Sequence, residues 1–199
     1  GEYGLVIPLG VRNIRKQLPL ILEDGDNALT IISRQAFQQL YEELVALDQR
    51  IASAKQQLEQ VCETNPRCQS LLTVPGVGPM VATALYATMG SPANYRNGRE
   101  FSAFLGLVPR QQSTGGKTVL RGISKRGDQH MRRLLIQGAQ AALRHMHKRN
   151  DALSRWACKL KATKGNGKAV VALANKLSRI CWAIKTSRRS ATIVYGITG

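Results

Sequence analysis

Apolar residues recur early in the chain at alternating steps of four and three positions. The repeat begins at Phe37 and continues through Leu40, Leu44, Leu47, Ile51, Ala54, Leu58 and Val61. This heptad pattern predicts a long helix with one apolar seam. Ser33 is a suitable N-cap and Asn65-Pro66 a suitable stop, so we expect a coiled-coil helix over residues 33–64. The seam either packs against the chain's own domain or joins two copies of the chain.

Residues 67–90 have the pattern of two short helices around a tight turn. The turn is Pro75-Gly76-Val77-Gly78, and Pro79 suits the first position of the second helix. The pattern resembles a helix-hairpin-helix element. In that interpretation Gly76 and Gly78 let backbone N–H groups approach a phosphate, with the positive end of the second helix behind them. A plain helical turn is the alternative.

The remaining pattern predicts further helices and one long loop. A short helix is expected between Arg99 and Leu107, then a loop over 110–127, and then a helix capped by Asp128. Two basic helices are expected around 153–161 and 169–188. The fold class is therefore mainly α: a long coiled-coil helix followed by a helical domain with a helix-hairpin-helix element. We expect four parts: 1–32 as a linker after a missing domain, the coiled coil 33–64, a central domain 65–150, and a basic extension 151–199.

Charge is distributed unevenly over the 199 residues. The chain has a formal net charge of +17, and after residue 100 only Asp128 and Asp151 oppose the Lys and Arg residues. Such a one-sided positive field is typical of a surface that neutralises nucleic acid. The candidate contacts, beside Gly76 and Gly78, are Lys117, Arg121, Lys125, Arg126 and Arg132. Arg132 stands near a helix N-terminus, where the helix dipole disfavours a cation, so an anionic partner would explain its place.

Several other classes of function are disfavoured. The four cysteines include no C-x-x-C pair, and the three histidines fit a solvated basic helix better than a metal site, so we assign no metal ligands. Gly116-Lys117-Thr118 imitates a nucleotide-binding loop, but Gln111 stands where that loop needs its first glycine. No apolar run reaches the roughly 20 residues of a membrane span, and no signal peptide opens the chain. We expect a soluble, cytoplasmic protein that does not bind membranes.

Ser113 is the candidate nucleophile. It lies in the Gly-rich segment Gln112-Ser113-Thr114-Gly115-Gly116-Lys117. A serine hydroxyl can attack a phosphodiester and retain the bond energy as a phosphoserine link to a DNA end. It needs backbone freedom beside it and cations that stabilise the developing charge. Lys117, Arg121, Lys125 and Arg126 could supply that charge, although a Ser-Thr-Gly-Gly turn alone is more often a plain loop.

Four ordered segments carry a resemblance to a known family. They are Leu72–Pro79, Phe104–Arg110, Gln112–Lys117 and Ile123–Asp128. Together with the heptad helix before them, they resemble the C-terminal transposase domain of the insertion sequence 110 family. The resemblance implies a DNA transposase, in some members guided by an RNA from the same element. By position, it implies that Ser113 is the nucleophile and that the cations after it face DNA or guide RNA.

The resemblance also implies a part that this sequence lacks. Family members carry an N-terminal DEDD domain of RuvC-like fold that binds magnesium. The acidic residues near the start, Glu23, Asp24 and Asp26, fit a solvated turn rather than a metal site. We therefore expect no cofactor in this chain, magnesium in the missing domain, and a chain that binds nucleic acid and self-associates but does not transpose unaided. We expect it at the nucleoid when it is bound.

Two other classes of protein remain open. A non-catalytic helix-hairpin-helix module would explain the charge and the turn, but Ser113 would then have no catalytic role. A ribosome- or RNA-associated basic protein would explain the charge alone.

Overall fold

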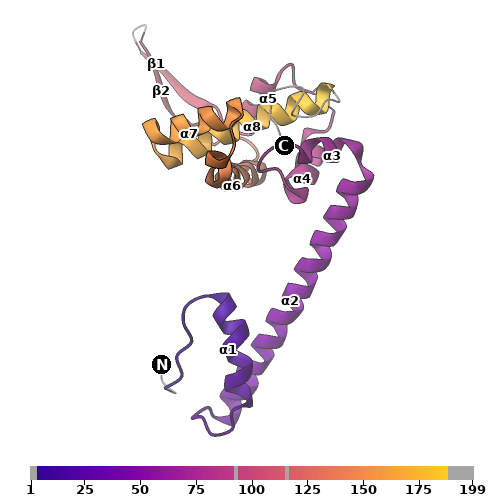
Figure 1. The fold of residues 1–199 in the computed structure, drawn as a ribbon, viewed down its shortest axis with the longest axis vertical. Helices are drawn as coiled ribbons and strands as arrows, with labels where there is room; N and C mark the ends of the chain where they lie inside the picture. Colours follow the sequence, from indigo (N-terminus) through magenta and orange to yellow (C-terminus); the bar gives the residue numbers. More distant parts are fainter. Residues whose placement is uncertain (1–3, 92–93, 115–116, 188–199) are drawn as a thin grey trace. The chain divides into compact units, whose positions relative to one another are not determined.

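The computed structural model describes residues 4–91, 94–114 and 117–187, with the backbone alone at 113, 114, 117, 118, 120 and 187. Most of these residues are helical, which confirms the mainly α fold (Figure 1). The helices are α1 (Val11–Glu23), α2 (Ile31–Thr64), α3 (Pro66–Leu72), α4 (Pro79–Met89), α5 (Gly98–Phe104), α6 (Gln129–His145), α7 (Ala152–Lys164) and α8 (Asn166–Ser187). The strands are β1 (Pro109–Thr114) and β2 (Lys117–Ile123). The chain divides into two compact units, residues 1–56 and 57–199.

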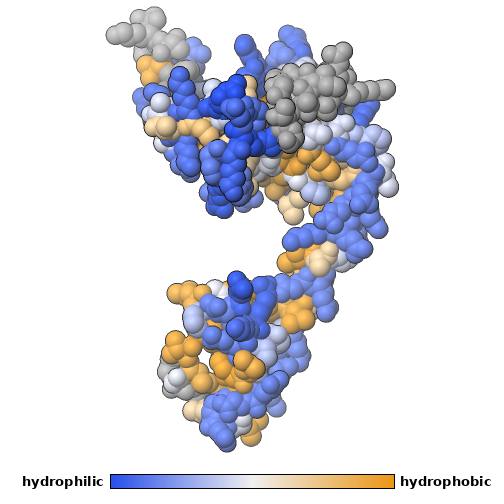
Figure 2. Space-filling model, viewed as in Figure 1, coloured by the Kyte–Doolittle hydropathy of each residue, from blue (hydrophilic) through white to orange (hydrophobic). Residues whose placement is uncertain are grey.

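The first unit contains a helix that the sequence did not predict. Residues 11–23, expected within a linker, form α1, although Pro19 lies inside it. Two arginines hold α1 beside α2: Arg15 forms a bidentate ion pair with Asp48 at 2.6 Å, and Arg34 donates to the carbonyls of Ile21 and Leu22. None of the described residues in this unit is buried, and apolar side chains of α1 and α2 reach the surface (Figure 2).

The long helix α2 begins earlier than predicted and ends as predicted. Thr30, not Ser33, caps it, because the Thr30 hydroxyl accepts a hydrogen bond from the Ser33 N–H. Ser33 therefore lies in the first turn. At the other end Asn65 closes α2 and starts α3, because its side-chain oxygen accepts from the N–H groups of Arg67 and Cys68. Pro66 occupies the first position of α3, where no N–H is needed.

The second unit packs around α8. Helices α5, α6 and α7 all lie against α8, whose apolar face is buried (Figure 1). The largest fully buried side chains include Phe101, Leu105, Met131, Leu135, Leu173 and Leu177. The helices expected after residue 98 are all present, with slightly different ends, and Asp128 caps α6 as predicted by accepting from the Met131 N–H.

The segment expected as a loop over 110–127 is largely an antiparallel ribbon, β1–β2. Ser113 pairs with Thr118, and Thr114 with Lys117. The intervening Gly115 and Gly116 lie outside the described residues. The register shifts between Pro109 and Gln111, close to where the ribbon leaves the helical core. Alternating polar residues in a basic context gave no apolar period from which to predict these strands.

Candidate nucleic-acid interface and serine site

Ser113 belongs to the end of the ribbon rather than to its base. It is the second-last residue of β1, one position before the last described pair of the ribbon, Thr114 and Lys117. The side chains of Ser113, Thr114 and Lys117 are outside the described part of the structure. The ribbon therefore carries the predicted nucleophile at a defined backbone position, near the end of β1 that is farther along the chain from α5.

The base of the ribbon is tied to the core by several hydrogen bonds. The Arg110 guanidinium donates to the Ser124 carbonyl through Nε and Nη2, at 3.3 and 3.1 Å. The Ser124 N–H donates to Val108, and the Lys125 N–H to Gly106. These bonds join both strands to the segment that follows α5, so the ribbon has a fixed root.

A close backbone approach at this root requires glycine. Gly127 has φ +105, and a Cβ added to it would overlap the carbonyl oxygen of Phe104. The same crossing brings Gly106, with φ +69, against the backbone of Arg126. The segment Ile123–Asp128 therefore passes very close to the backbone at the end of α5. The sequence did not predict this contact.

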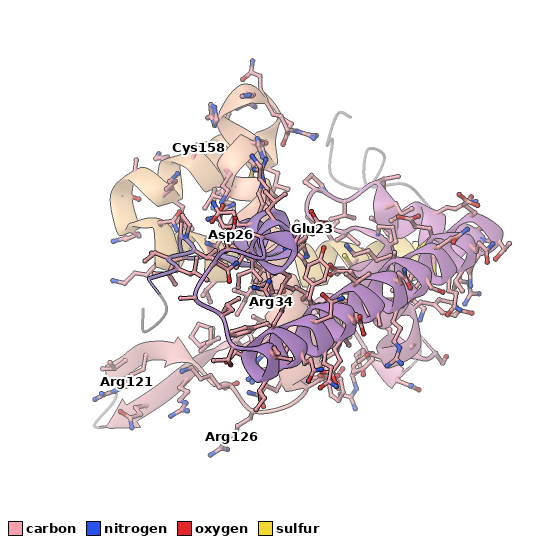
Figure 3. All side chains as sticks on the ribbon, turned by 90° about the horizontal axis from the view of Figure 1, so that it is seen from below. Glu23, Asp26, Arg34, Arg121, Arg126 and Cys158 are labelled. Atoms are coloured by element: carbon pink, nitrogen blue, oxygen red, sulfur yellow. The ribbon has the colours of Figure 1, made fainter. Side chains whose placement is uncertain are left out.

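Three of the predicted cations are available at the surface. Arg121, Lys125 and Arg126 are all exposed, and Figure 3 shows Arg121 on the ribbon and Arg126 near its root, both directed away from the helices. The two ion pairs among the described residues, Arg15–Asp48 and Arg149–Asp151, include none of the three. Lys125 also has φ +56, an uncommon conformation for a residue other than glycine.

Arg132 lies in a different environment from these three cations. It is only 9% exposed, and its Nη1 donates to the carbonyl of Leu105 at 3.0 Å. Gly106 lies against the same guanidinium group. The structure thus gives Arg132 a place inside the domain, where it holds the end of α5 to α6, and this contact explains its position near the helix N-terminus without an external anion.

The turn between α3 and α4 borders a hollow of about 570 Å³. Its lining includes residues 72–78 together with Ala141 and Arg149. Gly76 has φ +82, and a Cβ there would overlap the carbonyl oxygen of Gly138 in α6. Gly78 precedes α4 and has nothing within 4 Å of its Cβ position. The two glycines therefore differ: Gly76 permits helix packing, and Gly78 faces open space.

Sequence reasoning missed the partner of Gly76. Gly138 stands inside the otherwise regular helix α6, and its own Cβ position is blocked by the Gly76 carbonyl. An isolated glycine within a helical pattern is the signal that indicates such a close contact.

The acidic residues near the start of the chain lie at the end of α1 and in the turn after it. In the described ranges no three His, Cys, Asp or Glu side chains gather closely enough to hold a metal ion. Glu23 ends α1, and Asp24 accepts a hydrogen bond from the Asp26 N–H in the exposed turn after it. None of the helices in the described part of the chain combines the length and apolarity that a membrane crossing needs.

The middle of the chain is similar to a known family. Residues 68–155 match the Transposase IS116/IS110/IS902 family, which confirms the resemblance drawn from the motifs. The match runs from within α3 to the first turn of α7 and therefore includes the turn at 73–78, the ribbon and its root.

Individual relatives extend the similarity over most of the chain. The chain is 41% identical to the transposase for insertion sequence element IS1111A of Coxiella burnetii, across 95% of this chain and 52% of that protein. It is 40% identical to a probable family 20 transposase of Pseudomonas aeruginosa, across 92% of this chain and 55% of that protein. It is 35% identical to the transposase for element IS1328 of Yersinia enterocolitica, across 93% and 54%. The chain thus spans about half the length of the curated relatives it matches.

Proposed function

We propose that this chain is the DNA-binding and nucleophile-bearing part of a DNA transposase, with Ser113 as the attacking residue. The Ser113 hydroxyl attacks a DNA phosphodiester, one P–O bond forms to serine, and the leaving DNA strand departs with its own hydroxyl end. Attack by another DNA hydroxyl on the phosphoserine then transfers the strand and releases the serine. Each step forms one P–O bond and breaks another, and the proton of the attacking hydroxyl ends on the oxygen that leaves.

The observation that supports this proposal is the setting of the ribbon. A two-stranded element with a fixed root carries Ser113 in a pairing with Thr118. Arg121, Lys125 and Arg126 are exposed along or below it and have no ion pair among the described residues. Cations of this kind bind phosphate oxygens and stabilise the charge that develops during attack.

The proposal covers partners beyond the described chain. We propose that the magnesium-binding DEDD domain expected from the resemblance works with this serine, and that a guide RNA shares the basic surface with DNA. Cytoplasmic location with nucleoid association follows from a DNA partner.

Covalent trapping tests the nucleophile. The full-length enzyme is incubated with its cognate DNA and guide RNA, and protein–DNA adducts are separated under denaturing conditions. We expect an adduct with the wild type and none with Ser113→Ala, while Thr114→Ala retains it. An adduct of undiminished yield from Ser113→Ala would show that another group attacks.

A second candidate function is a non-catalytic helix-hairpin-helix module, favoured by one observation. The turn at 73–78 borders a hollow that includes Arg149, and Gly78 leaves the start of α4 open. A phosphate bound there would receive backbone N–H groups and the positive end of α4. Under this alternative Gly78 variants weaken DNA binding, and Ser113→Ala changes nothing.

The seam of α2 supports self-association as part of the proposal. Leu40, Leu47 and Ile51 keep 60%, 51% and 52% of their surface exposed, although they share the heptad stripe. A second copy of α2 would cover them, as heptad seams do in coiled coils.

A further inference from the structure

A second hollow lies at the junction of α2, α3, α4 and α8, on a part of the second unit that the serine site does not use. It has a volume of about 610 Å³. Its walls include the end of α2, the start of α3, Tyr86 of α4, and Ile184 and Lys185 of α8. All of these residues belong to the same compact unit.

The hollow is positively charged. Lys185 is 4% exposed, and its Nζ donates to the carbonyls of Tyr86 and Gly90 at 3.0 and 2.8 Å. Burial, and next the nearby charge of Arg67, lower the pKa of Lys185. Arg67 is exposed and takes part in neither of the ion pairs of the described chain. None of the described residues that line the hollow is acidic.

The hollow also offers an aromatic surface. Tyr86 is 37% exposed, and the Lys185 ammonium lies 4.8 Å from its ring centroid. Tyr86 therefore has a charged neighbour while part of the residue remains open to solvent. A partly exposed aromatic ring beside an exposed cation such as Arg67 is the combination with which proteins bind single-stranded nucleic acid: bases stack on the ring and phosphates approach the cation.

We propose that this hollow binds an unpaired nucleotide of the nucleic acid, with its base against Tyr86 and its phosphate beside Arg67. The inference rests on the proposed function only in taking nucleic acid as the partner. It adds a site for a single-stranded segment that is separate from the ribbon, and a duplex would not enter it because its bases are stacked and paired.

Fluorescence anisotropy with the complete chain tests the site. The probes are a labelled oligothymidylate of about 12 nucleotides, a length typical of single-strand binding assays, and a duplex of the same length. Tyr86→Ala should weaken oligothymidylate binding by about 5-fold or more, and Tyr86→Phe, which keeps the ring, by less than about 2-fold. Neither variant should change duplex binding by more than about 2-fold, because the duplex is held by its phosphates.

Arg67→Gln provides an independent test that does not disturb the fold, since this side chain is exposed. It should lower the affinity for the single strand and reduce the slope of log affinity against log salt by about 0.7, one phosphate contact. Lys159→Gln on α7, another exposed cation, is the matched control and should leave the difference between single strand and duplex unchanged.

Two results would overturn the site. The first is that Tyr86→Ala and Arg67→Gln bind the oligothymidylate with an affinity within about 2-fold of the affinity of the control variant Lys159→Gln. The second combines two observations: polyglutamate of equal charge displaces the oligothymidylate, and Tyr86→Ala has no effect. Together they would identify the hollow as a site for an acidic peptide. Ser113→Ala should bind the oligothymidylate normally, so failure of the nucleophile in trapping and failure of this hollow are separate results.

Discussion

Gly76 and Gly138 contact each other backbone to backbone, so that a Cβ on either would overlap the carbonyl oxygen of the other. This contact presses the turn between α3 and α4 against the middle of α6. It explains a glycine that sequence reasoning had connected only with phosphate binding. The position of the turn, and of the hollow beside it, therefore depends on two residues 62 positions apart in the sequence.

Gly76→Ala should destabilise the second unit strongly. The residue has φ +82, where alanine is strained by about 1–2 kcal/mol, and the overlap with Gly138 adds to this. We expect a loss of about 2–4 kcal/mol in the free energy of unfolding, measured by urea denaturation. Gly78→Ala is the matched control: with φ −92 and open space around it, it should cost less than about 1 kcal/mol. Equal losses in the two variants would contradict the packing role.

Variants of Arg132 and Arg126 should show that the first arginine stabilises the fold and that the second does not. Arg132→Met leaves the Leu105 carbonyl without its donor and should cost about 1–3 kcal/mol of unfolding free energy. Arg126→Gln changes an exposed side chain and should leave stability within about 0.5 kcal/mol.

The salt dependence of DNA binding should change in the Arg126 variant and not in the Arg132 variant, the reverse of the effect on stability. Arg126→Gln should reduce the salt slope of duplex binding by about 0.9, one phosphate contact, whereas folded Arg132→Met should keep the wild-type slope. The comparison is made by anisotropy at several salt concentrations. A reduced slope in Arg132→Met alone would mean that the buried arginine reaches DNA after all.

Charge placed on the α2 seam should dissociate an oligomer. Leu47→Glu and Ile51→Glu put carboxylates on the heptad stripe, where they would face each other across paired helices. We expect a smaller assembly by sedimentation equilibrium, with a dissociation constant raised by at least about 10-fold per pair. Gln49→Glu, on the outer side of the same helix, should leave the mass unchanged. A wild-type chain that is monomeric at all concentrations would rule out the seam as an interface.

Asp151 should make stability fall in acid. Its carboxylate accepts from the Ser154 N–H and hydroxyl and pairs with Arg149 at 3.0 Å. Burial by itself raises the pKa of Asp151, but the hydrogen bonds from Ser154 and the Arg149 pair outweigh it, and the pKa lies below the usual value. A lowered pKa means that the folded state binds the proton less well than the unfolded state, so this contribution is complete above pH of about 4 and is lost as the pH falls through the folded pKa.

The comparison with Asp151→Asn isolates that contribution. At pH 7 the variant should be less stable than the wild type by about 1–2 kcal/mol, and the difference should shrink as the pH approaches about 3. Thermal unfolding across this range measures it, and Glu59→Gln, an exposed site on α2, should show no such trend. A difference that is constant with pH would exclude the carboxylate as the cause.

The sequence predicted those parts of the fold that a local period or cap determines. The stripe of α2, the stop at Asn65-Pro66 and the cap at Asp128 each depend on neighbouring residues, and all three are present. The helix α1 was not predicted because Pro19, which has no backbone N–H, usually argues against a helix interior. In the structure α1 nevertheless continues through Pro19.

The errors at the candidate site have another physical origin. The ribbon depends on pairing between strands without a clear apolar alternation, and the burial of Arg132 depends on Leu105, 27 positions away. The same holds for Gly76 and Gly138. Contacts between distant segments decided these features, so residue type and spacing could suggest which residues matter but not which of them face outward.

The absence of buried side chains in the described residues of the first unit has a consequence for regulation. If a second copy covers α1 and α2, the concentration of the dimer rises with the square of the chain's concentration when the protein is scarce. A twofold change in expression would then alter the concentration of the dimer about fourfold, so assembly would respond steeply to the rate of translation.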